Sequence, residues 1–278
     1  MRILVTGCRG MLGSDVVNLF SGKHEVLGSD INEFDICNIS QAEPFFASFM
    51  PDVVIHCAAF TNVDECETSS VKAFSINSEG ARNIGLCCEK YGAKMVYIST
   101  DYVFDGSSRT AYHEYDQPSP IGVYGMSKYY GERHVEKTCR KSFIVRTSWL
   151  FGKNGHNFVK AIQKQISEKK KLAVVVDQWG SPTYTLDLAG FLLELINTEK
   201  YGIYHATNEG FCNWLDFASA IASFSGAGRV EITGITSDKL NRKAARPLNS
   251  TLHKTSIISA GLNLLPRWED ALKRYLNS

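Results

Sequence analysis

Short apolar runs alternate with longer segments of helical pattern through the first half of the chain. The apolar runs of strand length are 2–6, 25–29, 52–56, 94–99 and 142–146. The segments of helical length are 11–20, 70–91 and 124–137. Runs that are apolar at successive positions indicate strands buried on both faces of a parallel sheet, and their alternation with helices indicates βαβ units. The pattern therefore predicts an α/β fold with a doubly wound parallel sheet.

The second half of the chain has a looser pattern. Its segments predict a strand at 172–176 and helices at 157–169, 186–197, 213–225 and 267–276. No low-complexity linker or internal repeat separates the two halves. We therefore divide the chain into a core, residues 1–147, and a smaller C-terminal lobe, residues 148–278, and the pattern allows segments of the lobe to return to the core.

Composition narrows the classes of function. Thirty Lys and Arg residues stand against 29 Asp and Glu among the 278 residues, a formal net charge of +1. This balance argues against a nucleic-acid-binding surface and against a disordered chain. The apolar stretches are far shorter than the ~20 residues of a membrane span, and the first residues lack the pattern of a signal peptide. The eight cysteines form no CxxC pair, so we expect reduced thiols, a cytoplasmic protein and no metal site.

Gly7, Gly10 and Gly13 form a GxxGxxG pattern between the first strand and the first helix. Such glycines permit a tight turn, a close approach of backbone N–H groups to a pyrophosphate, and tight packing of helix on strand. The positive end of the helix dipole also favours phosphates there. An ordinary turn is the plainer interpretation, but the position within the first βαβ unit favours a dinucleotide-binding site of the Rossmann type.

Asp30 ends the second predicted strand, where a carboxylate accepts hydrogen bonds from the adenosine ribose of a dinucleotide. The same carboxylate repels the 2′-phosphate of NADP, whereas Arg9 in the glycine loop is able to pair with that phosphate. The sequence therefore leaves NADH and NADPH both open as the cofactor. Asp35 and Ile36 follow in a short loop that we place beside the adenine, and a solvent-exposed loop is an equally good interpretation of these two residues.

A second group of polar residues lies at the carboxyl edge of the predicted sheet, where open α/β folds bind ligands. Thr100 and Asp101 end the fourth strand, and Tyr124 and Lys128 form YxxxK, which places both side chains on one face of a helix. We expect the Lys128 ammonium to lower the pKa of Tyr124 from its ordinary value of about 10. Tyr124 would then exchange a proton with a carbonyl oxygen that Thr100 orients. A Tyr and a Lys four apart are usually a surface pair, so this interpretation depends on the glycine pattern upstream.

Several blocks of the sequence resemble one known family. They are LVTGCRGMLG (4–13), HCAAFTNVDECE (56–67), INSEGARNI (76–84), YISTDYVFDG (97–106), VYGMSKYYGE (123–132), VRTSWLFG (145–152), NFVKAI (157–162), VVDQWGSPT (175–183) and ARPLNSTL (245–252). The chain resembles the extended short-chain dehydrogenase/reductase family, and within it the dTDP-4-dehydrorhamnose reductases. The glycines and YxxxK are typical of the whole superfamily, whereas the STDYVFDG, RTSWLFG, DQWGSPT and RPLNS blocks indicate the sugar-nucleotide reductase branch.

The resemblance implies a role for each matching residue. The implied cofactor-binding residues are Gly7, Gly10, Met11, Leu12, Gly13, Asp30, Asp35, Ile36, Ala58, Ala59, Phe60, Tyr124 and Lys128. Phe60 replaces the small residue that is usual in the family, which leaves the shape of the cofactor cleft there open. The implied substrate contacts are Thr100, Asp101 and Trp149. Arg246 in the RPLNS block is a further candidate because a guanidinium forks onto phosphate oxygens, and a surface loop arginine is an equally good interpretation.

The resemblance implies NAD(P)H-dependent reduction of a 4-keto sugar nucleotide, with dTDP-4-dehydro-L-rhamnose as the leading substrate and Tyr124 as the proton donor. The catalytic set is Thr100, Tyr124 and Lys128. The C-terminal lobe would bind the substrate.

An alternative is a non-catalytic regulatory subunit similar to that of methionine adenosyltransferase, which resembles the same branch. An epimerase-reductase of the GDP-fucose type would need an added Cys/His pair that we do not find. The sequence leaves open the nucleotide base, the sugar stereochemistry and whether the protein forms a homodimer.

Overall fold

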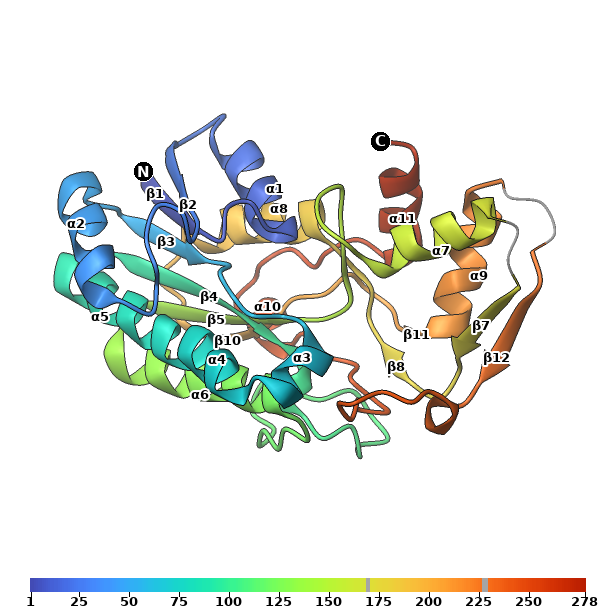
Figure 1. The fold of residues 1–278 in the computed structure, drawn as a ribbon. Helices are drawn as coiled ribbons and strands as arrows, with labels where there is room; N and C mark the ends of the chain where they lie inside the picture. Colours follow the sequence, from blue (N-terminus) through green and yellow to red (C-terminus); the bar gives the residue numbers. More distant parts are fainter. Residues whose placement is uncertain (169–170, 227–229) are drawn as a thin grey trace.

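A six-stranded parallel sheet forms the centre of the molecule (Figure 1). The computed structural model describes residues 1–168, 171–226 and 230–278. The strands of this sheet are β1 (Arg2–Thr6), β2 (Glu25–Ser29), β3 (Val53–His56), β4 (Lys94–Thr100), β5 (Ser142–Thr147) and β10 (Gly202–His205). Their order across the sheet is β2-β1-β3-β4-β5-β10, and every neighbouring pair is parallel. The predicted doubly wound parallel sheet is confirmed, with its switch point between β1 and β3.

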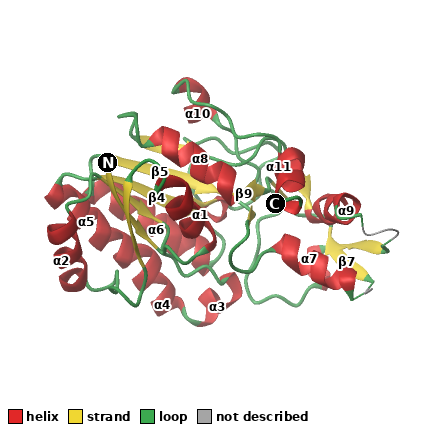
Figure 2. Ribbon diagram, turned by 90° about the horizontal axis from the view of Figure 1, so that it is seen from above, coloured by secondary structure: helices red, strands yellow, loops and turns green. Residues whose placement is uncertain are grey.

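Helices cover both faces of the sheet (Figure 2). One face packs against α1 (Met11–Phe20), α8 (Thr185–Leu195) and α10 (Thr255–Ser259). The other face packs against α2 (Ile39–Phe49), α5 (Ala81–Tyr91) and α6 (Val123–Thr138). Alternate side chains of β1 serve the two layers: Ile3 and Val5 belong to the first cluster and Leu4 to the second. Strands buried on both faces in this way produce the continuous apolar runs of the sequence.

The sequence predicts some elements better than others. The bounds of β1, α1 and β2 are those predicted, whereas helix α2 was not predicted. The predicted helix 70–91 is divided in the structure into α4 (Ser70–Phe74), the π-helix η1 (Ser75–Gly80) and α5, and a short helix α3 (Val63–Thr68) precedes it. The buried Asn77 lies in the π-helical turn, where its side chain bonds to a neighbouring loop. Single π-helical turns of this kind are frequent at functional sites.

A third apolar cluster lies in the C-terminal lobe, apart from the sheet (Figure 1). Its main elements are α7 (Phe158–Ser167), β7 (Leu172–Val175), α9 (Trp214–Phe224), β12 (Ile232–Ile235) and α11 (Trp268–Leu276). Of the predicted helix 157–169, the last residue lies outside the described ranges. The remaining short elements are η2 (Asp101–Val103), β6 (Leu150–Phe151), β8 (Trp179–Gly180), β9 (Thr183–Tyr184), β11 (Cys212–Asn213) and η3 (Ser237–Lys239).

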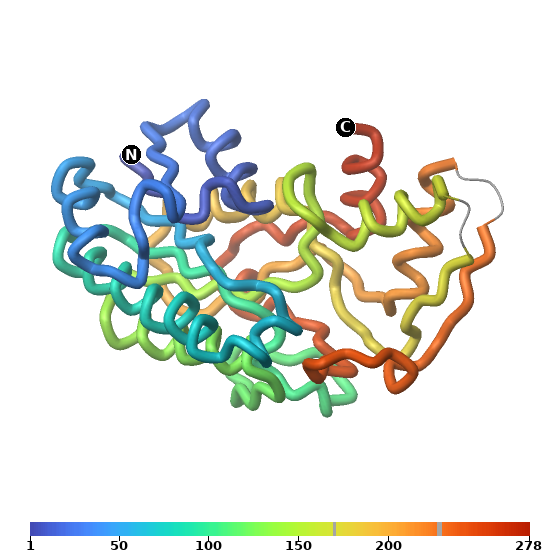
Figure 3. The backbone as a smooth tube through the Cα atoms, in the orientation of Figure 1, coloured from blue at the N-terminus to red at the C-terminus, as the bar shows by residue number. Residues whose placement is uncertain are grey.

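Part of the second half of the chain returns to the core, as Figure 3 traces. Helix α8 packs on α1, and β10 extends the sheet beside β5. Helix α9 begins with a capping box, in which the Asn213 side chain accepts from the Asp216 N–H. The eight cysteines all lie in described residues and are free thiols. None of the helices in the described ranges has both the length and the hydrophobicity of a membrane-spanning segment.

A buried ion pair fixes α6 to the sheet. Arg146 of β5 and Glu132 of α6 are each 1% exposed. Arg146 Nε and Nη2 donate to the two carboxylate oxygens of Glu132 at 2.9 and 2.7 Å, and Ser99 Oγ of β4 donates to Glu132 Oε1 at 2.5 Å. His205 Nδ1 lies 3.0 Å from the His253 carbonyl oxygen, to which it must donate, so its Nε2 is free to accept from Arg146 Nη1 at 3.3 Å. Three strands therefore hold one helix through a fully buried polar network.

We expect Glu132→Ala to lower the free energy of unfolding by about 3–5 kcal/mol, because it leaves the Arg146 guanidinium buried without its carboxylate. Urea denaturation monitored by circular dichroism measures the change. Glu136→Ala is the matched control on the same helix, since its partner Arg133 is exposed and such pairs contribute about 0–1 kcal/mol. Equal losses in the two variants would show that the buried pair does not fix the helix.

Candidate active site

Two cavities meet at the carboxyl edge of the sheet. The larger has a volume of about 990 Å³ and the smaller about 520 Å³. Gly7, Gly10, Cys57 and Ala59 line both, so the cavities join at the glycine loop. This junction lies at the switch point between β1 and β3, where doubly wound sheets bind nucleotides. Together the two cavities form one elongated site.

The glycine loop approaches its neighbours too closely for side chains. Gly7 has a φ of +69°, and a Cβ there would lie 2.6 Å from the Ala58 backbone N. A Cβ on Gly13 would lie 2.1 Å from the Gly7 carbonyl oxygen. Gly10 is the N-cap of α1, and no side chain caps that helix end. The loop is therefore a cradle of backbone N–H groups at a helix N-terminus, which fits a pyrophosphate.

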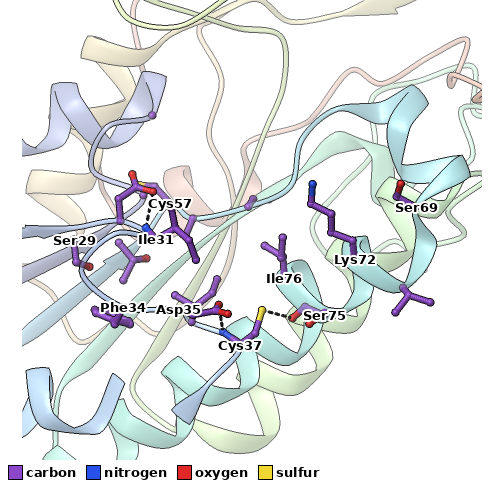
Figure 4. A pocket seen from close by; sticks show the side chains of 18 of the residues that line it. Ser29, Ile31, Phe34, Asp35, Cys37, Cys57, Ser69, Lys72, Ser75 and Ile76 are labelled. Atoms are coloured by element: carbon purple, nitrogen blue, oxygen red, sulfur yellow. Dashed lines mark hydrogen bonds between the residues drawn. The ribbon is translucent and has the colours of Figure 1, made fainter. Parts of the chain in front are cut away.

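The structure places most of the predicted cofactor residues around the two cavities. Those that line the larger cavity are Gly7, Gly10, Asp30, Asp35, Ile36, Ala58 and Ala59, and those that line the smaller one include Gly7, Gly10, Met11, Leu12, Gly13, Ala59, Tyr124 and Lys128. Asp30 Oδ1 accepts from the Ile31 N–H at 2.9 Å, and Asp35 Oδ1 accepts from the Cys37 N–H at 2.9 Å (Figure 4). These two carboxylates thus also order the turns in which they lie.

The sequence analysis missed several residues of the larger cavity. Ile31 and Phe34 follow β2, and Lys72 extends from α4 on the opposite side (Figure 4). Short helices such as α4 and single residues after a strand carry no motif. These residues come to lie beside the cavity only when the chain folds back over the sheet, so the local sequence pattern does not predict them.

Phe60, which the resemblance places in the cofactor cleft, contacts Asn77 and Lys72. It is not among the described residues that line either cavity. Its backbone N–H donates to Asn77 Oδ1 at 2.7 Å, its carbonyl oxygen accepts from Asn77 Nδ2, and its ring lies 4.4 Å from Lys72 Nζ. Asn77 Nδ2 also donates to Ser127 Oγ at 2.9 Å. Asn77, to which the sequence analysis gave no role, therefore links the loop after β3 to helix α6.

The smaller cavity brings together the predicted catalytic and substrate residues. Thr100, Asp101, Tyr124, Lys128 and Trp149 all line it, with Tyr102 and Trp214 as members that the sequence analysis missed. The start of α6, which carries Tyr124, is fixed by α3, because Glu67 Oε1 accepts from the Val123 N–H at 2.8 Å. The site therefore unites the end of β4, the first turns of α6 and the loop after β5.

Burial controls the ionisation of the two YxxxK residues. Burial raises the pKa of Tyr124 above its ordinary value, and a hydrogen bond with Thr100 only partly opposes this. Lys128 by itself therefore does not lower the pKa of Tyr124 in this structure, because loss of solvent outweighs any neighbouring charge, and the expectation also relied on the positive nicotinamide of an oxidised cofactor. Burial lowers the pKa of Lys128 to about 7, against the stabilising charge of Glu132, and its Nζ lies 4.1 Å from the centre of the Tyr97 ring. Tyr124 is thus a neutral phenol with a proton to give.

Asp101 is a second buried acid in the smaller cavity. It is 2% exposed, and its Oδ1 accepts from Thr100 Oγ1 at 3.0 Å. Burial raises the pKa of Asp101 to about 6, and hydrogen bonds from Ser250 and Thr100 limit the rise. Asp101 thereby fixes the direction of the Thr100 hydroxyl in the wall of the smaller cavity.

Trp149 lies where the chain passes from β5 into the lobe and packs on the lobe's apolar cluster. Its backbone has a φ of +47°, a conformation that costs energy in a residue with a bulky side chain and that is typical of functional positions. Its ring stacks on Trp214 of α9 with centroids 3.5 Å apart and an interplanar angle of 9°. A Cβ on Gly180 would lie 2.4 Å from Trp149 Cε2, so the indole needs the glycine of the DQWGSPT block to occupy this place.

Arg246 is held by a carboxylate. Its Nη1 and Nη2 donate to the two oxygens of Asp64 in α3, each at 2.7 Å, and Asp64 Oδ1 also accepts from the Ala244 N–H at 3.0 Å. Arg246 is not among the described residues that line the two cavities. It interacts with the Tyr102 side chain, which does line the smaller cavity, so it lies just behind the cavity wall.

Comparison with known proteins agrees with this site. The family model described as the RmlD substrate binding domain matches residues 1–278. The dTDP-4-dehydrorhamnose reductase of Aggregatibacter actinomycetemcomitans is 39% identical, over 98% of this chain and 97% of that protein. This chain belongs to the dTDP-4-dehydrorhamnose reductase family. The resemblance seen in the sequence is thereby confirmed.

Two further relatives extend the comparison. The spore coat polysaccharide biosynthesis protein SpsK of Bacillus subtilis is 40% identical over 99% of this chain and 96% of that protein. The crystal structure of dTDP-4-dehydrorhamnose reductase from Bacillus anthracis, solved in complex with NADP, superposes with a TM-score of 0.97 at 40% identity. It covers 99% of this chain and 98% of its own, so the two folds correspond from end to end.

We expect Lys128→Met to raise the midpoint of thermal unfolding by a few degrees below pH 7, although it removes a site residue. The folded state lowers the pKa of Lys128 to about 7 from an unfolded value near 10.5. Below pH 7 both states are protonated and the folded state bears the full cost of burying the ammonium. As pH rises from 7 toward 10.5 only the unfolded state keeps the proton, so this cost declines and the variant loses its advantage.

Lys137→Met, at an exposed position of the same helix, is the control for general effects of the substitution. Scanning calorimetry from pH 6 to pH 10 measures both variants. A Lys128→Met protein less stable than the wild type at every pH would mean that the ammonium is stabilised where it lies.

Proposed function

We propose that this chain reduces the 4-keto group of a sugar nucleotide, dTDP-4-dehydro-L-rhamnose, to give dTDP-L-rhamnose, with NADPH or NADH as the reductant. The observation that carries the proposal is the smaller cavity, in which Thr100, Tyr124 and Lys128 lie beside the glycine loop. Membership in the dTDP-4-dehydrorhamnose reductase family over the whole chain supports it.

A dinucleotide fits the elongated site. We assign the pyrophosphate to the backbone of the glycine loop and the α1 N-terminus, because Gly7 and Gly13 allow the backbone to pack tightly there and Gly10 leaves the helix start without a capping side chain. The adenosine belongs in the larger cavity, which Asp30 lines at the end of β2. The nicotinamide belongs in the smaller cavity near Tyr124 and Lys128. The bound reduced dinucleotide supplies the hydride, and the protein supplies the proton.

Tyr124 is the proton donor. Because burial keeps its phenol protonated well above neutral pH, Tyr124 is able to give a proton to the substrate carbonyl oxygen as the carbonyl carbon is reduced. Thr100 lies beside it, and its hydroxyl hydrogen, which Asp101 Oδ1 accepts in this structure, turns to the substrate oxygen and orients it when the substrate binds. Lys128, held between Glu132 and the Tyr97 ring, stabilises the negative charge that develops when Tyr124 loses its proton.

The substrate lies between the core and the lobe. We assign residues 1–147 to cofactor binding and residues 148–278 mainly to substrate binding, since Trp149 and Trp214 of the lobe line the smaller cavity opposite core residues such as Tyr124. The stacked indoles offer an apolar face for the sugar. Arg246, which contacts Tyr102 of the cavity wall, is our candidate for binding the substrate diphosphate.

We also propose that the protein acts in the cytoplasm, since its eight thiols are reduced. We propose a homodimer as its form in solution, and light scattering of the purified protein measures the mass that tests this.

We expect Tyr124→Phe to lower the rate of keto-sugar reduction by ~10² to 10⁴, the usual effect of losing a general acid. Dinucleotide affinity should stay within about two-fold, because the substitution removes only a hydroxyl. Absorbance at 340 nm follows NAD(P)H consumption by the purified protein with dTDP-4-dehydro-L-rhamnose. Tyr130→Phe, at an exposed tyrosine of the same helix, is the control and should keep the wild-type rate.

Two outcomes would contradict these assignments. Turnover that survives in Tyr124→Phe would leave a reductase but remove Tyr124 from its proton transfer. Tight dinucleotide binding by the wild type without turnover of any dTDP- or GDP-linked 4-keto sugar would instead favour the regulatory alternative.

A further inference from the structure

The arginine of the glycine loop is held by a glutamate. Arg9 Nη1 donates to Glu33 Oε2 at 3.0 Å, and Arg9 Nη2 donates to Glu33 Oε1 at 2.5 Å. Both ends of the guanidinium fork are therefore occupied by one carboxylate. The Arg9 side chain is 55% exposed and that of Glu33 30%, so solvent and ligands reach the pair.

The pair is tied to the proposed ribose position. Glu33 Oε2 also accepts from the Asp30 N–H at 2.7 Å, and Asp30 Oδ2 accepts from the Arg9 N–H at 3.2 Å. Arg9, Asp30 and Glu33 thus form a closed ring of hydrogen bonds across the loops after β1 and β2. Asp30 and Ile31 both line the larger cavity, so this ring lies at the proposed adenosine end of the site.

The charges of the ring disfavour a phosphate on the ribose. Two carboxylates stand against one guanidinium, which leaves one net negative charge beside the 2′ position. A guanidinium binds a phosphate through pairs of parallel N–H groups, and Glu33 occupies the pair at the end of the Arg9 side chain. A 2′-phosphate that binds this end must displace the Glu33 carboxylate, and one that binds the remaining N–H groups must lie beside its negative charge, whereas a 2′-hydroxyl does neither.

We propose that Glu33 is a specificity-determining residue for the dinucleotide, which competes with the 2′-phosphate of NADPH for Arg9 and so favours NADH. This inference rests on the proposed dinucleotide site at the glycine loop. It assigns to Arg9 a conditional role: the end of its guanidinium binds a phosphate only when the carboxylate is moved away.

Glu33→Gln tests the proposal with little change in shape. The amide oxygen of Gln is still able to accept from the Asp30 N–H, so the turn after β2 keeps its bond, while the charge that holds Arg9 is lost. We expect the dissociation constant of NADPH to fall roughly 3- to 10-fold and that of NADH to stay within about two-fold. Fluorescence titration of each reduced dinucleotide measures both constants without any sugar nucleotide.

The double variant Arg9→Gln/Glu33→Gln separates the stated cause from a general loss of negative charge. The gain for NADPH should disappear in it, because the gain depends on the freed guanidinium. Glu136→Gln, in the exposed pair with Arg133, is the matched control and should leave both constants unchanged.

The proposal is overturned if NADPH binding fails to tighten in Glu33→Gln, or if the gain persists in the double variant. Wild-type protein that binds neither dinucleotide would overturn the cofactor site itself, and this inference with it. Binding of both dinucleotides with unchanged preference in Glu33→Gln would overturn only the role of Glu33.

Discussion

The buried ion pair between Glu132 and Arg146 is the constraint on which the candidate site depends. Helix α6 carries Tyr124 and Lys128 two turns and one turn before Glu132, so the position of that carboxylate fixes the position of both. A charge pair in the core is costly unless all its partners are present. Ser99 and His205 complete the set from two further strands, and the helix has only one position in which every partner is satisfied.

The sequence predicts those parts of the fold whose residues are determined locally. The bounds of β1, α1 and β2 follow from apolar periodicity and from the glycines between β1 and α1, and burial on both faces of β1 leaves little choice of residue there. Helix α2 and the π-helical turn around Asn77 depend on contacts with segments that lie elsewhere in the chain. The cavity residues Lys72 and Trp214 are likewise brought to the site by the fold, and no local pattern marks them.

Both arginines that the sequence offered as phosphate ligands have carboxylate partners in the structure. Arg9 pairs with Glu33 from the loop after β2, and Arg246 pairs with Asp64, 182 residues earlier in the chain. A carboxylate has the same fork-shaped geometry as two phosphate oxygens, so it keeps a guanidinium extended and in place. Residue type alone shows that an arginine suits a phosphate, but only the fold shows what the phosphate must displace.

The stacked indoles of Trp149 and Trp214 have a spectroscopic consequence. Two chromophores with centroids 3.5 Å apart couple their electronic transitions, and the coupling gives a circular dichroism signal when the two transition dipoles are twisted relative to each other. Trp149 follows β5 by two residues and Trp214 begins helix α9, and both line the smaller cavity. The protein therefore contains its own optical reporter of how this wall of the cavity is packed, readable in solution without any label.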